Sequence, residues 1–356
     1  MLIAGMRPAL ADAIAFARAH ESPWPESLML PDGRFVMTAD SGESPPDDEV
    51  LGPVPSRGPQ AGQIWQGSRL LAEWGDVARA DITFSVAKSY LALLAGLALG
   101  DRLIGDLDER AGDRVRDGGF DAPQNRDITW RHLLTQTSEW EGAVFGKADR
   151  IDRNRVVGPV KAAGPKGSHR DLRAPGSFYE YNDVRVNRLS VSLLHLFREP
   201  LPQVLKRRIM DPIGASSGWR WNGYRNSTLT IDGRPMVSVP GGSHWGGGLV
   251  ISAADLALTG RLVAADGVWN GKRLLPEGWC RALREPCRVA PFYGLLWWLN
   301  TRRGQIPAAP ESSYFAMGWG SHILWIEPER DLVVAVRWID RSHFPGFAER
   351  VLSATA

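Results

Sequence analysis

Cysteine is scarce in this chain of 356 residues, which contains only Cys280 and Cys287. There is no Cys-x-x-Cys pair, and no group of histidines lies beside either residue. Two cysteines cannot build the disulfide framework of a small secreted domain, and their surroundings lack the ligand spacing of a zinc site. The sequence therefore predicts two free thiols, and we expect neither a disulfide nor a bound metal.

Long apolar runs are also missing. The longest, Tyr90 to Leu99, is too short to supply the ~20 residues of a membrane-spanning helix. At the N-terminus, Arg7 and Pro8 interrupt the stretch in which a signal peptide would be continuously apolar. We therefore expect a soluble, cytoplasmic protein that has no membrane partner.

Positively and negatively charged side chains are nearly balanced over the whole chain. Lys and Arg number 42 against 40 Asp and Glu, so the formal net charge of +2 gives no reason to expect a nucleic-acid partner. One segment differs, because residues 147–173 hold eight Lys or Arg against three Asp. A segment this long without periodicity is either a solvated mobile loop or a basic rim that faces the substrate.

Strand patterns occur at the two ends of the chain, whereas short helices and long loops fill the middle. A hairpin is predicted around a Gly-Ser turn, and three more strands follow late in the chain; the segments are 63–76, 293–300, 321–328 and 331–339. We predict an α/β (α+β) protein in which residues 1–104 and 241–356 form a five-stranded sheet domain. Residues 105–240 are predicted to form an inserted, mostly helical domain.

One predicted helix is apolar on every face and yet begins with a lysine. Its segment, ITFSVAKSYLALLAGLALGD, has no charge from Tyr90 to Leu99, which is typical of a helix buried in a large domain. Ser85 and Lys88 are three residues apart and are therefore neighbours on one helix face. A buried ammonium must be paired or become neutral, and a neutral lysine accepts protons. The pair therefore predicts a nucleophile beside its base.

A glycine-rich stretch lies at residues 243–263, SHWGGGLVISAADLALTGRLV. Its glycines follow neither the GxxxxGK[ST] nor the GxGxxG pattern of phosphate-binding loops. We expect them instead to allow backbone segments to approach closely beside a site. Ser252 is predicted to cap the helix that follows, with Asp255 three residues later.

A second segment with reactive side chains is APGSFYEYNDVRVNRLS, residues 174–190. It contains a Pro-Gly-x-x-x-x-Tyr-Asn-Asp box that ends at Asp183. Together with Ser85-Val86-Ala87-Lys88 and the late strand pair, this box resembles the serine β-lactamase and penicillin-binding-protein superfamily. The similarity is greatest to class C-like serine hydrolases, which include family VIII esterases and 6-aminohexanoate-dimer hydrolases. The resemblance covers nearly the whole chain and implies an antiparallel sheet flanked by helices.

The resemblance also assigns roles within this box. In that family the box is Tyr-x-Asn, and its tyrosine acts as general base together with the lysine. Tyr181 takes that position here, and Asp183 replaces the asparagine. Tyr179 competes on chemistry alone, but the two-residue spacing to Asp183 favours Tyr181. Because a nearby ammonium favours a phenolate, Asp183 would assist by holding Lys88 charged.

The third box of the family departs from its pattern in this chain. Family members carry Lys-Thr-Gly, His-x-Gly or Trp-x-Gly, whereas this chain has Ala316-Met317-Gly318 followed by Trp319. The family's lysine helps to bind the carboxylate of penicillin-like substrates, so its absence argues against efficient β-lactam turnover. The resemblance further implies that the backbone N–H groups of Ser85 and Trp319 form the oxyanion hole.

Several residues are predicted to line a substrate pocket. His244 and Trp245 lie in the glycine-rich loop, and Gly318 lies in the third box. His322 follows on a strand, where a histidine is more typical of the core or the surface than of a catalytic site. Tryptophan in the lining would suit apolar or planar acyl groups.

The sequence thus predicts a serine hydrolase that cleaves a small-molecule ester or amide through an acyl group on Ser85. Lys88 and Tyr181 would deprotonate the serine, and neither a metal nor an organic cofactor is expected. A transacylase or a weak β-lactamase acting at the same site is the first alternative. The second is a catalytically silent ligand-binding relative, because the third box is altered.

Overall fold

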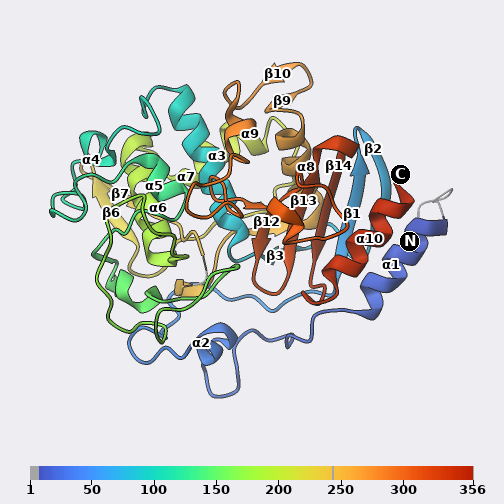
Figure 1. Cartoon of the computed structure of the whole chain (residues 1–356), viewed down its shortest axis with the longest axis horizontal. Coiled ribbons are helices and arrows are strands. Elements are labelled where there is room, and N and C mark those ends of the chain that lie inside the picture. The colour runs from blue at the N-terminus through green and yellow to red at the C-terminus, as the bar shows by residue number, and fades with distance from the viewer. Residues whose placement is uncertain (1–7, 243, 356) are drawn as a thin grey trace.

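The computed structural model describes residues 8–242 and 244–355 and has a mixed α/β fold around one main antiparallel sheet (Figure 1). The sheet order is β11-β12-β13-β14-β1-β2, and each neighbouring pair is antiparallel. Its strands are β1 (Ala61–Gln66), β2 (Arg69–Trp74), β11 (Trp298–Leu299), β12 (Tyr314–Gly318), β13 (His322–Glu327) and β14 (Leu332–Arg337). The predicted fold class and the origin of the sheet in both chain ends are confirmed.

The predicted number of five strands is wrong, because the sheet has six. The missing strand is β12, whose sequence YFAMG has no polar alternation and ends in glycine. The segment predicted at 293–300 contributes only the two residues of β11. Leu296 has a φ of +58°, which interrupts the extended conformation there.

Both faces of the sheet are covered, which explains why β13 and β14 are continuously apolar rather than alternating. Side chains on neighbouring positions of a strand point to opposite faces. Leu324 lies against Gly260 of α8 (Ala253–Ala264), whereas Trp325 packs on Phe344 of α10 (Phe344–Ala354). Helix α1 (Pro8–Ala19) packs on α10, so the two ends of the chain meet on one face.

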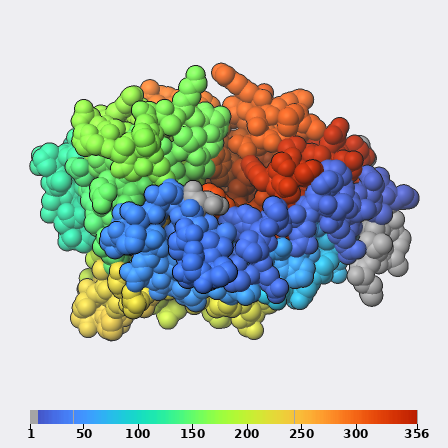
Figure 2. Space-filling view, turned by 90° about the horizontal axis from the view of Figure 1, so that it is seen from below, coloured from blue at the N-terminus to red at the C-terminus, as the bar shows by residue number. Residues whose placement is uncertain are grey.

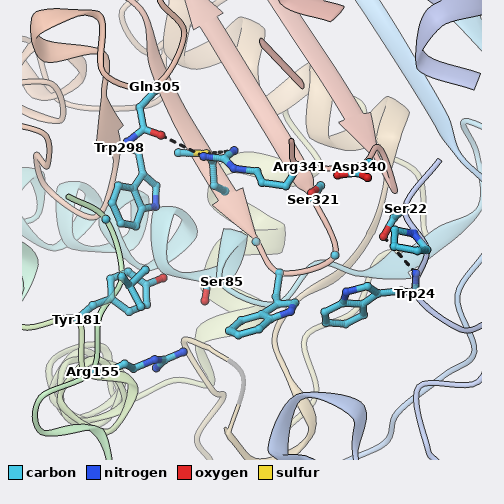
Figure 3. Close-up of a pocket in the computed structure, with 17 residues that line it drawn as sticks. Ser22, Trp24, Ser85, Arg155, Tyr181, Trp298, Gln305, Ser321, Asp340 and Arg341 are labelled. Atoms are coloured by element: carbon cyan, nitrogen blue, oxygen red, sulfur yellow. Dashed lines mark hydrogen bonds between the residues drawn. The ribbon is translucent and has the colours of Figure 1, made fainter. Parts of the chain in front are cut away.

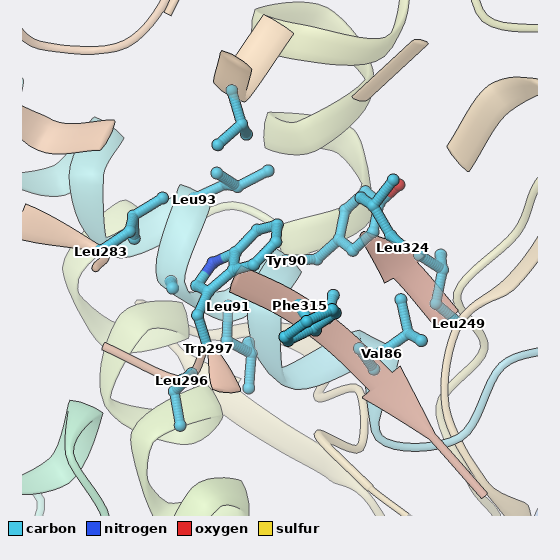
Figure 4. Packing of buried hydrophobic residues seen from close by; sticks show 14 of the residues in the cluster. Val86, Tyr90, Leu91, Leu93, Leu249, Leu283, Leu296, Trp297, Phe315 and Leu324 are labelled. Atoms are coloured by element: carbon cyan, nitrogen blue, oxygen red, sulfur yellow. The ribbon is translucent and has the colours of Figure 1, made fainter. Parts of the chain in front are cut away.

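The helix α3 (Val86–Gly100) runs through the interior beside the sheet. Every residue from Val86 to Ala98 is buried, and Figure 4 shows Tyr90 and Leu91 packed among Trp297, Phe315 and neighbouring aliphatic side chains. This is the apolar helix that the sequence predicts, and its N-terminal end is the part that carries reactive groups.

Residues 105–240 form mostly helices and loops, and they lie to one side of the sheet in Figure 1. The longest helix there is α6 (Asp183–Phe197), which packs on α3 and is capped by the Asn182 side chain. The shorter elements are α4 (Ala111–Arg114), α5 (Trp130–Leu134), β4 (Ala143–Val144), β5 (Lys147–Ala148), η1 (Asp149–Asp152), α7 (Leu201–Leu205), η2 (Lys206–Met210), β6 (Thr228–Ile231) and β7 (Arg234–Val237). The division into a sheet domain and an inserted domain at residues 105 and 240 stays a prediction.

The remaining elements connect these parts. They are α2 (Val36–Ser41), β3 (Ala80–Ile82), β8 (Val250–Ser252), β9 (Val268–Trp269), β10 (Lys272–Arg273) and α9 (Trp279–Ala282). The Ser252 hydroxyl accepts a hydrogen bond from the backbone N–H of Asp255, so the predicted cap of α8 is present. Within the described residues, no helix has the length and apolar character needed to cross a bilayer.

Candidate active site

Two glycines from distant segments hold the backbone just before Ser85. A Cβ atom on Gly318, at the end of β12, would lie 1.9 Å from the carbonyl oxygen of Thr83. A Cβ atom on Gly248 would lie 2.2 Å from the carbonyl oxygen of Phe84. Phe84 itself has a φ of +49°, which is uncommon for a bulky residue. Ser85 is therefore positioned by a tight fit between the glycine-rich loop and the third box.

Lys88 is buried one turn into α3, and its ammonium group has two polar partners. The Nζ atom donates to Ser85 Oγ at 2.8 Å and lies 2.6 Å from Asp183 Oδ1. The glycine at Gly242 leaves room for these contacts, because a Cβ atom there would lie 2.5 Å from Nζ. The serine and lysine that the sequence pairs are thus in direct contact.

Tyr181 lies on the other side of Lys88 and faces the same serine. The Lys88 Nζ atom is 4.7 Å from the centroid of the Tyr181 ring. In Figure 3 the Tyr181 hydroxyl points toward Ser85, and its ring stacks on Trp298 with 5.6 Å between centroids. The structure therefore brings Ser85, Lys88 and Tyr181 together.

Tyr179, the competing tyrosine, points into a different environment. Its ring packs edge-on against Phe292 and Tyr293, and it is not among the residues that line the cavity at Ser85. Burial raises the pKa of Tyr179 well above its usual value, which disfavours the phenolate that a base would need. The geometry favours Tyr181 over Tyr179.

Asp183 joins Lys88 to an arginine from the basic segment. Its Oδ1 atom faces Lys88, its Oδ2 atom lies 3.0 Å from Arg155 Nη1, and its backbone N–H donates to Asp152 Oδ2. Burial opposes ionisation of this carboxyl, but Arg155 and Lys88 outweigh it and hold the pKa of Asp183 well below its usual value. An aspartate in place of the family's asparagine therefore adds a full negative charge beside Lys88.

The ion pairs continue beyond Arg155. Arg155 Nη1 lies 3.3 Å from Asp152 Oδ2, and the same oxygen lies 3.1 Å from His244 Nε2. The other ring nitrogen of His244 is 3.4 Å from Glu43, and Lys166 contacts Glu43 at 2.5 Å and Asp152 at 3.6 Å. We call these seven side chains the buried charge network: Glu43, Lys88, Asp152, Arg155, Lys166, Asp183 and His244.

Buried ion pairs anchor part of the basic segment 147–173, whereas its bases Arg150, Lys161 and Arg173 are exposed. Four of its bases pair with acids whose side chains are at least mostly buried: Arg153 with Asp149, Arg155 with Asp152 and Asp183, Lys166 with Glu43, and Arg170 with Glu139 and Glu180. Only Arg155 of these four lines the cavity at Ser85, so the alternative of a basic rim applies to that side chain.

Glu43, Asp152 and His244 also place ligand atoms within 4.8 Å of one another, a spacing that a metal ion would accept. The donor atoms are already engaged, however. Both ring nitrogens of His244 face carboxylate oxygens, and Lys166 contacts both acids. The chemistry of this donor set fits ion pairs and does not fit a metal.

A cavity of about 450 Å³ opens at Ser85. Four aromatic side chains form part of its walls, and charged side chains also line it. The aromatic residues are Trp24, Tyr181, Trp298 and Trp319, and the charged ones are Arg155, Asp340 and Arg341. Figure 2 shows a hollow between the blue N-terminal segment, the green middle segment and the orange-red C-terminal segments. Trp319 is 40% exposed, although it is a large apolar side chain. A concave aromatic surface beside a nucleophile is suited to hold an organic substrate.

In the structure, some of the predicted pocket residues line a cavity and one does not. Gly318 lines the cavity at Ser85, and so does Trp319. His244 lines a smaller adjoining cavity of about 200 Å³ instead. Trp245 lies outside the linings of both, because its buried ring stacks on Tyr224 with centroids 5.0 Å apart. The glycine-rich loop turns its aromatic side chain toward the core rather than toward the substrate.

His322 is also fully buried, as expected for a core histidine. Its ring lies 4.4 Å from that of Trp338 and 6.1 Å from that of Phe84. Neither ring nitrogen has a hydrogen-bond partner within the described residues. Burial lowers the pKa of His322 to about 3, so the ring is neutral.

The family model described as Beta-lactamase matches residues 82–348, which include Ser85, Lys88, Tyr181 and the third box. The chain belongs to the beta-lactamase family. No curated protein matches it.

Solved structures share the fold of this beta-lactamase family member at low sequence identity. A penicillin-binding protein homologue from Caulobacter crescentus has a TM-score of 0.63 at 13% identity, and 99% of this chain aligns with 100% of that one. A family VIII carboxylesterase has a TM-score of 0.61 at 13% identity, with 100% and 99% covered. EstCE1, described as a hydrolase with promiscuous acyltransferase activity, has a TM-score of 0.58 at 15% identity, with 83% and 93% covered.

Sequence reasoning missed several residues of this family member's site. Trp24 and Glu43 come from the N-terminal segment, before the residues that the family model matches. Nothing in their local sequence marks them as parts of a site. Arg155 and Asp152 lie in the basic segment, whose unusual charge was the available signal.

Proposed function

We propose that this protein is a serine hydrolase that cleaves an ester or amide through an acyl group on Ser85. The observation that carries the proposal is the contact of Lys88 Nζ with Ser85 Oγ at 2.8 Å, beside Tyr181 and at the edge of the aromatic cavity. The hydrolase activities named for members of the same fold support this reaction class.

Asp183 determines which of Lys88 and Tyr181 can accept the proton of Ser85. With a carboxylate 2.6 Å from Nζ, Lys88 is held as an ammonium that donates to Ser85 and has no lone pair to accept its proton. Tyr181 therefore acts as the general base, in its phenolate form. Ser85 Oγ bonds to the substrate carbonyl carbon while its proton moves to the Tyr181 oxygen.

The rest of the cycle uses the same groups. The backbone N–H groups of Ser85 and Trp319 stabilise the oxyanion of the tetrahedral intermediate. When the carbon–oxygen or carbon–nitrogen bond breaks, the leaving group takes the proton from Tyr181. Water then attacks the acyl-serine, giving one proton to Tyr181, and Ser85 Oγ recovers a proton as the carboxylic acid product leaves.

The third box argues against efficient turnover of β-lactams. Ala316 stands where the family's Lys-Thr-Gly box has its lysine, so no cation at that position is available for a substrate carboxylate. A transacylase remains the second candidate, because EstCE1 combines hydrolysis with acyl transfer on the same fold. Product analysis with and without an acceptor amine distinguishes hydrolysis from transfer.

The test measures p-nitrophenyl ester hydrolysis and labelling by a fluorophosphonate probe. We expect Ser85→Ala to abolish both, and Tyr181→Phe to lower kcat by about 10²–10⁴-fold, whereas Tyr179→Phe retains most activity. Ser22→Ala is the matched control, because Ser22 lines the same cavity and should leave labelling intact. Labelling that persists in Ser85→Ala would refute the nucleophile, and labelling without turnover in the natural protein would indicate the silent relative.

A further inference from the structure

The buried charge network is a continuous chain of ion pairs. It runs from Lys88 through Asp183, Arg155, Asp152 and His244 to Glu43 and Lys166. The network thus links the nucleophile to the N-terminal segment. Six of its side chains are nearly inaccessible, and Lys166, at 21% exposure, forms its outer edge.

The network contains four bases and three acids, so its net charge depends on His244. Burial alone would lower the pKa of His244, but the Asp152 and then the Glu43 carboxylates outweigh burial and raise it to about 9. At neutral pH, His244 is therefore an imidazolium, and four positive charges face three negative ones. One positive charge is left uncompensated among these seven side chains, which border the cavities at Ser85 and at His244.

Two cations of the network lie beside the ring of Tyr181. The Arg155 guanidinium carbon lies 5.4 Å from the centroid of the Tyr181 ring, and Lys88 Nζ lies 4.7 Å from it. A buried excess charge is unfavourable until an opposite charge forms beside it. Tyr181 is the residue in contact with these cations that gains a negative charge by losing a proton.

We propose that His244 is a positioning residue for the reaction, whose positive charge acts through Asp152 and Arg155 to favour the phenolate of Tyr181. This inference rests on the proposed function of Tyr181 as base. If His244 were neutral, the Asp152 carboxylate would offset Arg155 and leave no net positive charge for the phenolate. The histidine would thus control the base without touching the substrate.

The groups that face His244 come from several elements. Asp152 lies at the end of η1, Glu43 follows α2, and the ring of Trp245 lies 5.7 Å away on the same loop. Lys147 of β5 packs nearby, with its ammonium bonded to the backbone carbonyl of Asp47. Lys147 adds a positive charge that faces Glu43 and Asp152, and Asp47 is a further acid beside it, so the two do not cancel the excess.

Two substitutions of opposite sign test this inference. His244→Gln removes a positive charge from the network, and Glu43→Gln removes a negative one. A unit charge several ångströms away at an effective dielectric constant of about 20 changes a proton affinity by about tenfold. We therefore expect the acid limb of kcat/KM to move up by about one pH unit in His244→Gln and down in Glu43→Gln.

The same shifts should appear without turnover. Ultraviolet titration of tyrosinate, taken as the difference between each variant and its Tyr181→Phe counterpart, reports this one phenol even in a Ser85→Ala background. His195→Gln is the matched control, because His195 pairs with Asp117 outside the network and should shift neither curve. If His244→Gln does not fold, Lys166→Met removes a positive charge at the accessible edge and should also move both curves upward.

Shifts of opposite direction in the two variants would support the inference, because loosening of the structure would move both in the same direction. The inference is overturned if both curves shift alike or if neither moves. It is also overturned if His244→Gln changes only the KM of carboxylate-bearing esters, which would make the excess charge a substrate anion site. Absence of fluorophosphonate labelling would instead refute the proposed function, and the tyrosinate titration would still be readable.

Discussion

Two histidines of this protein are both buried but differ in charge state. His322 lies among Phe84 and Trp338 with no polar partner within the described residues, and burial lowers its pKa to about 3. His244 lies between Asp152 and Glu43; burial would lower its pKa as well, but the two carboxylates raise it to about 9. Partners, and not depth, decide whether a buried imidazole is charged.

The largest expected effect is the loss of stability at acid pH that comes from His322. Because the pKa of His322 is lowered, its contribution to stability is present above the unfolded pKa of about 6.5 and is lost as the pH falls toward 3. The loss amounts to about 5 kcal/mol in full and about 3 kcal/mol by pH 4. His322→Phe should remove this part of the acid instability in urea unfolding measured from pH 7 to pH 4. Parallel curves for the two proteins would show that His322 titrates normally.

The contrast predicts the opposite slope for His244. Its raised pKa means that its contribution is complete below pH 6.5 and is lost as the pH rises through about 9. The free energy of unfolding should therefore decrease by about 3 kcal/mol over that interval. In His244→Gln this alkaline decrease should flatten, and His322→Phe should retain it. An unchanged alkaline slope in His244→Gln would contradict the charge assigned to this ring.

A third histidine, His195, should give the smallest effect on stability. His195 is partly exposed and lies 3.3 Å from a single carboxylate, that of Asp117. Burial lowers the pKa of His195 even though Asp117 opposes the change. We expect NMR titration midpoints to increase from His322 to His195 to His244. His195→Gln should alter stability by less than about 1 kcal/mol, because partly exposed ion pairs contribute little. A midpoint for His195 above that of His244 would break the series.

Much of the fold could be predicted from local patterns. The apolar helix after Ser85, the early hairpin and the last two strands each have a clear period or composition. The strand β12 was missed because five apolar residues ending in glycine have no strand period. Motif spacing was sufficient to pair Ser85 with Lys88 and to prefer Tyr181 over Tyr179.

The surroundings of the site could not be predicted, because they depend on contacts between distant residues. Glu43 stands in a Pro/Gly-rich connector that reads as a linker, and only the fold shows that it contacts Lys166 and His244. The bases of the segment 147–173 suggested a solvated loop, since several of their acidic partners, such as Glu43 and Glu139, lie outside the segment. Trp245 was expected near substrate, but the φ of +66° at this residue belongs to a turn that carries its ring onto Tyr224.

The position of Glu43 has a consequence for where this protein can be cut. The family match begins at residue 82, yet an acid at residue 43 completes the electrostatics behind the nucleophile, and Trp24 forms part of the cavity wall. A truncated version that starts at the boundary of sequence similarity would keep the nucleophile and discard its distant counter-charge. A fragment that is still recognisable as a family member can therefore be too short to contain the whole site.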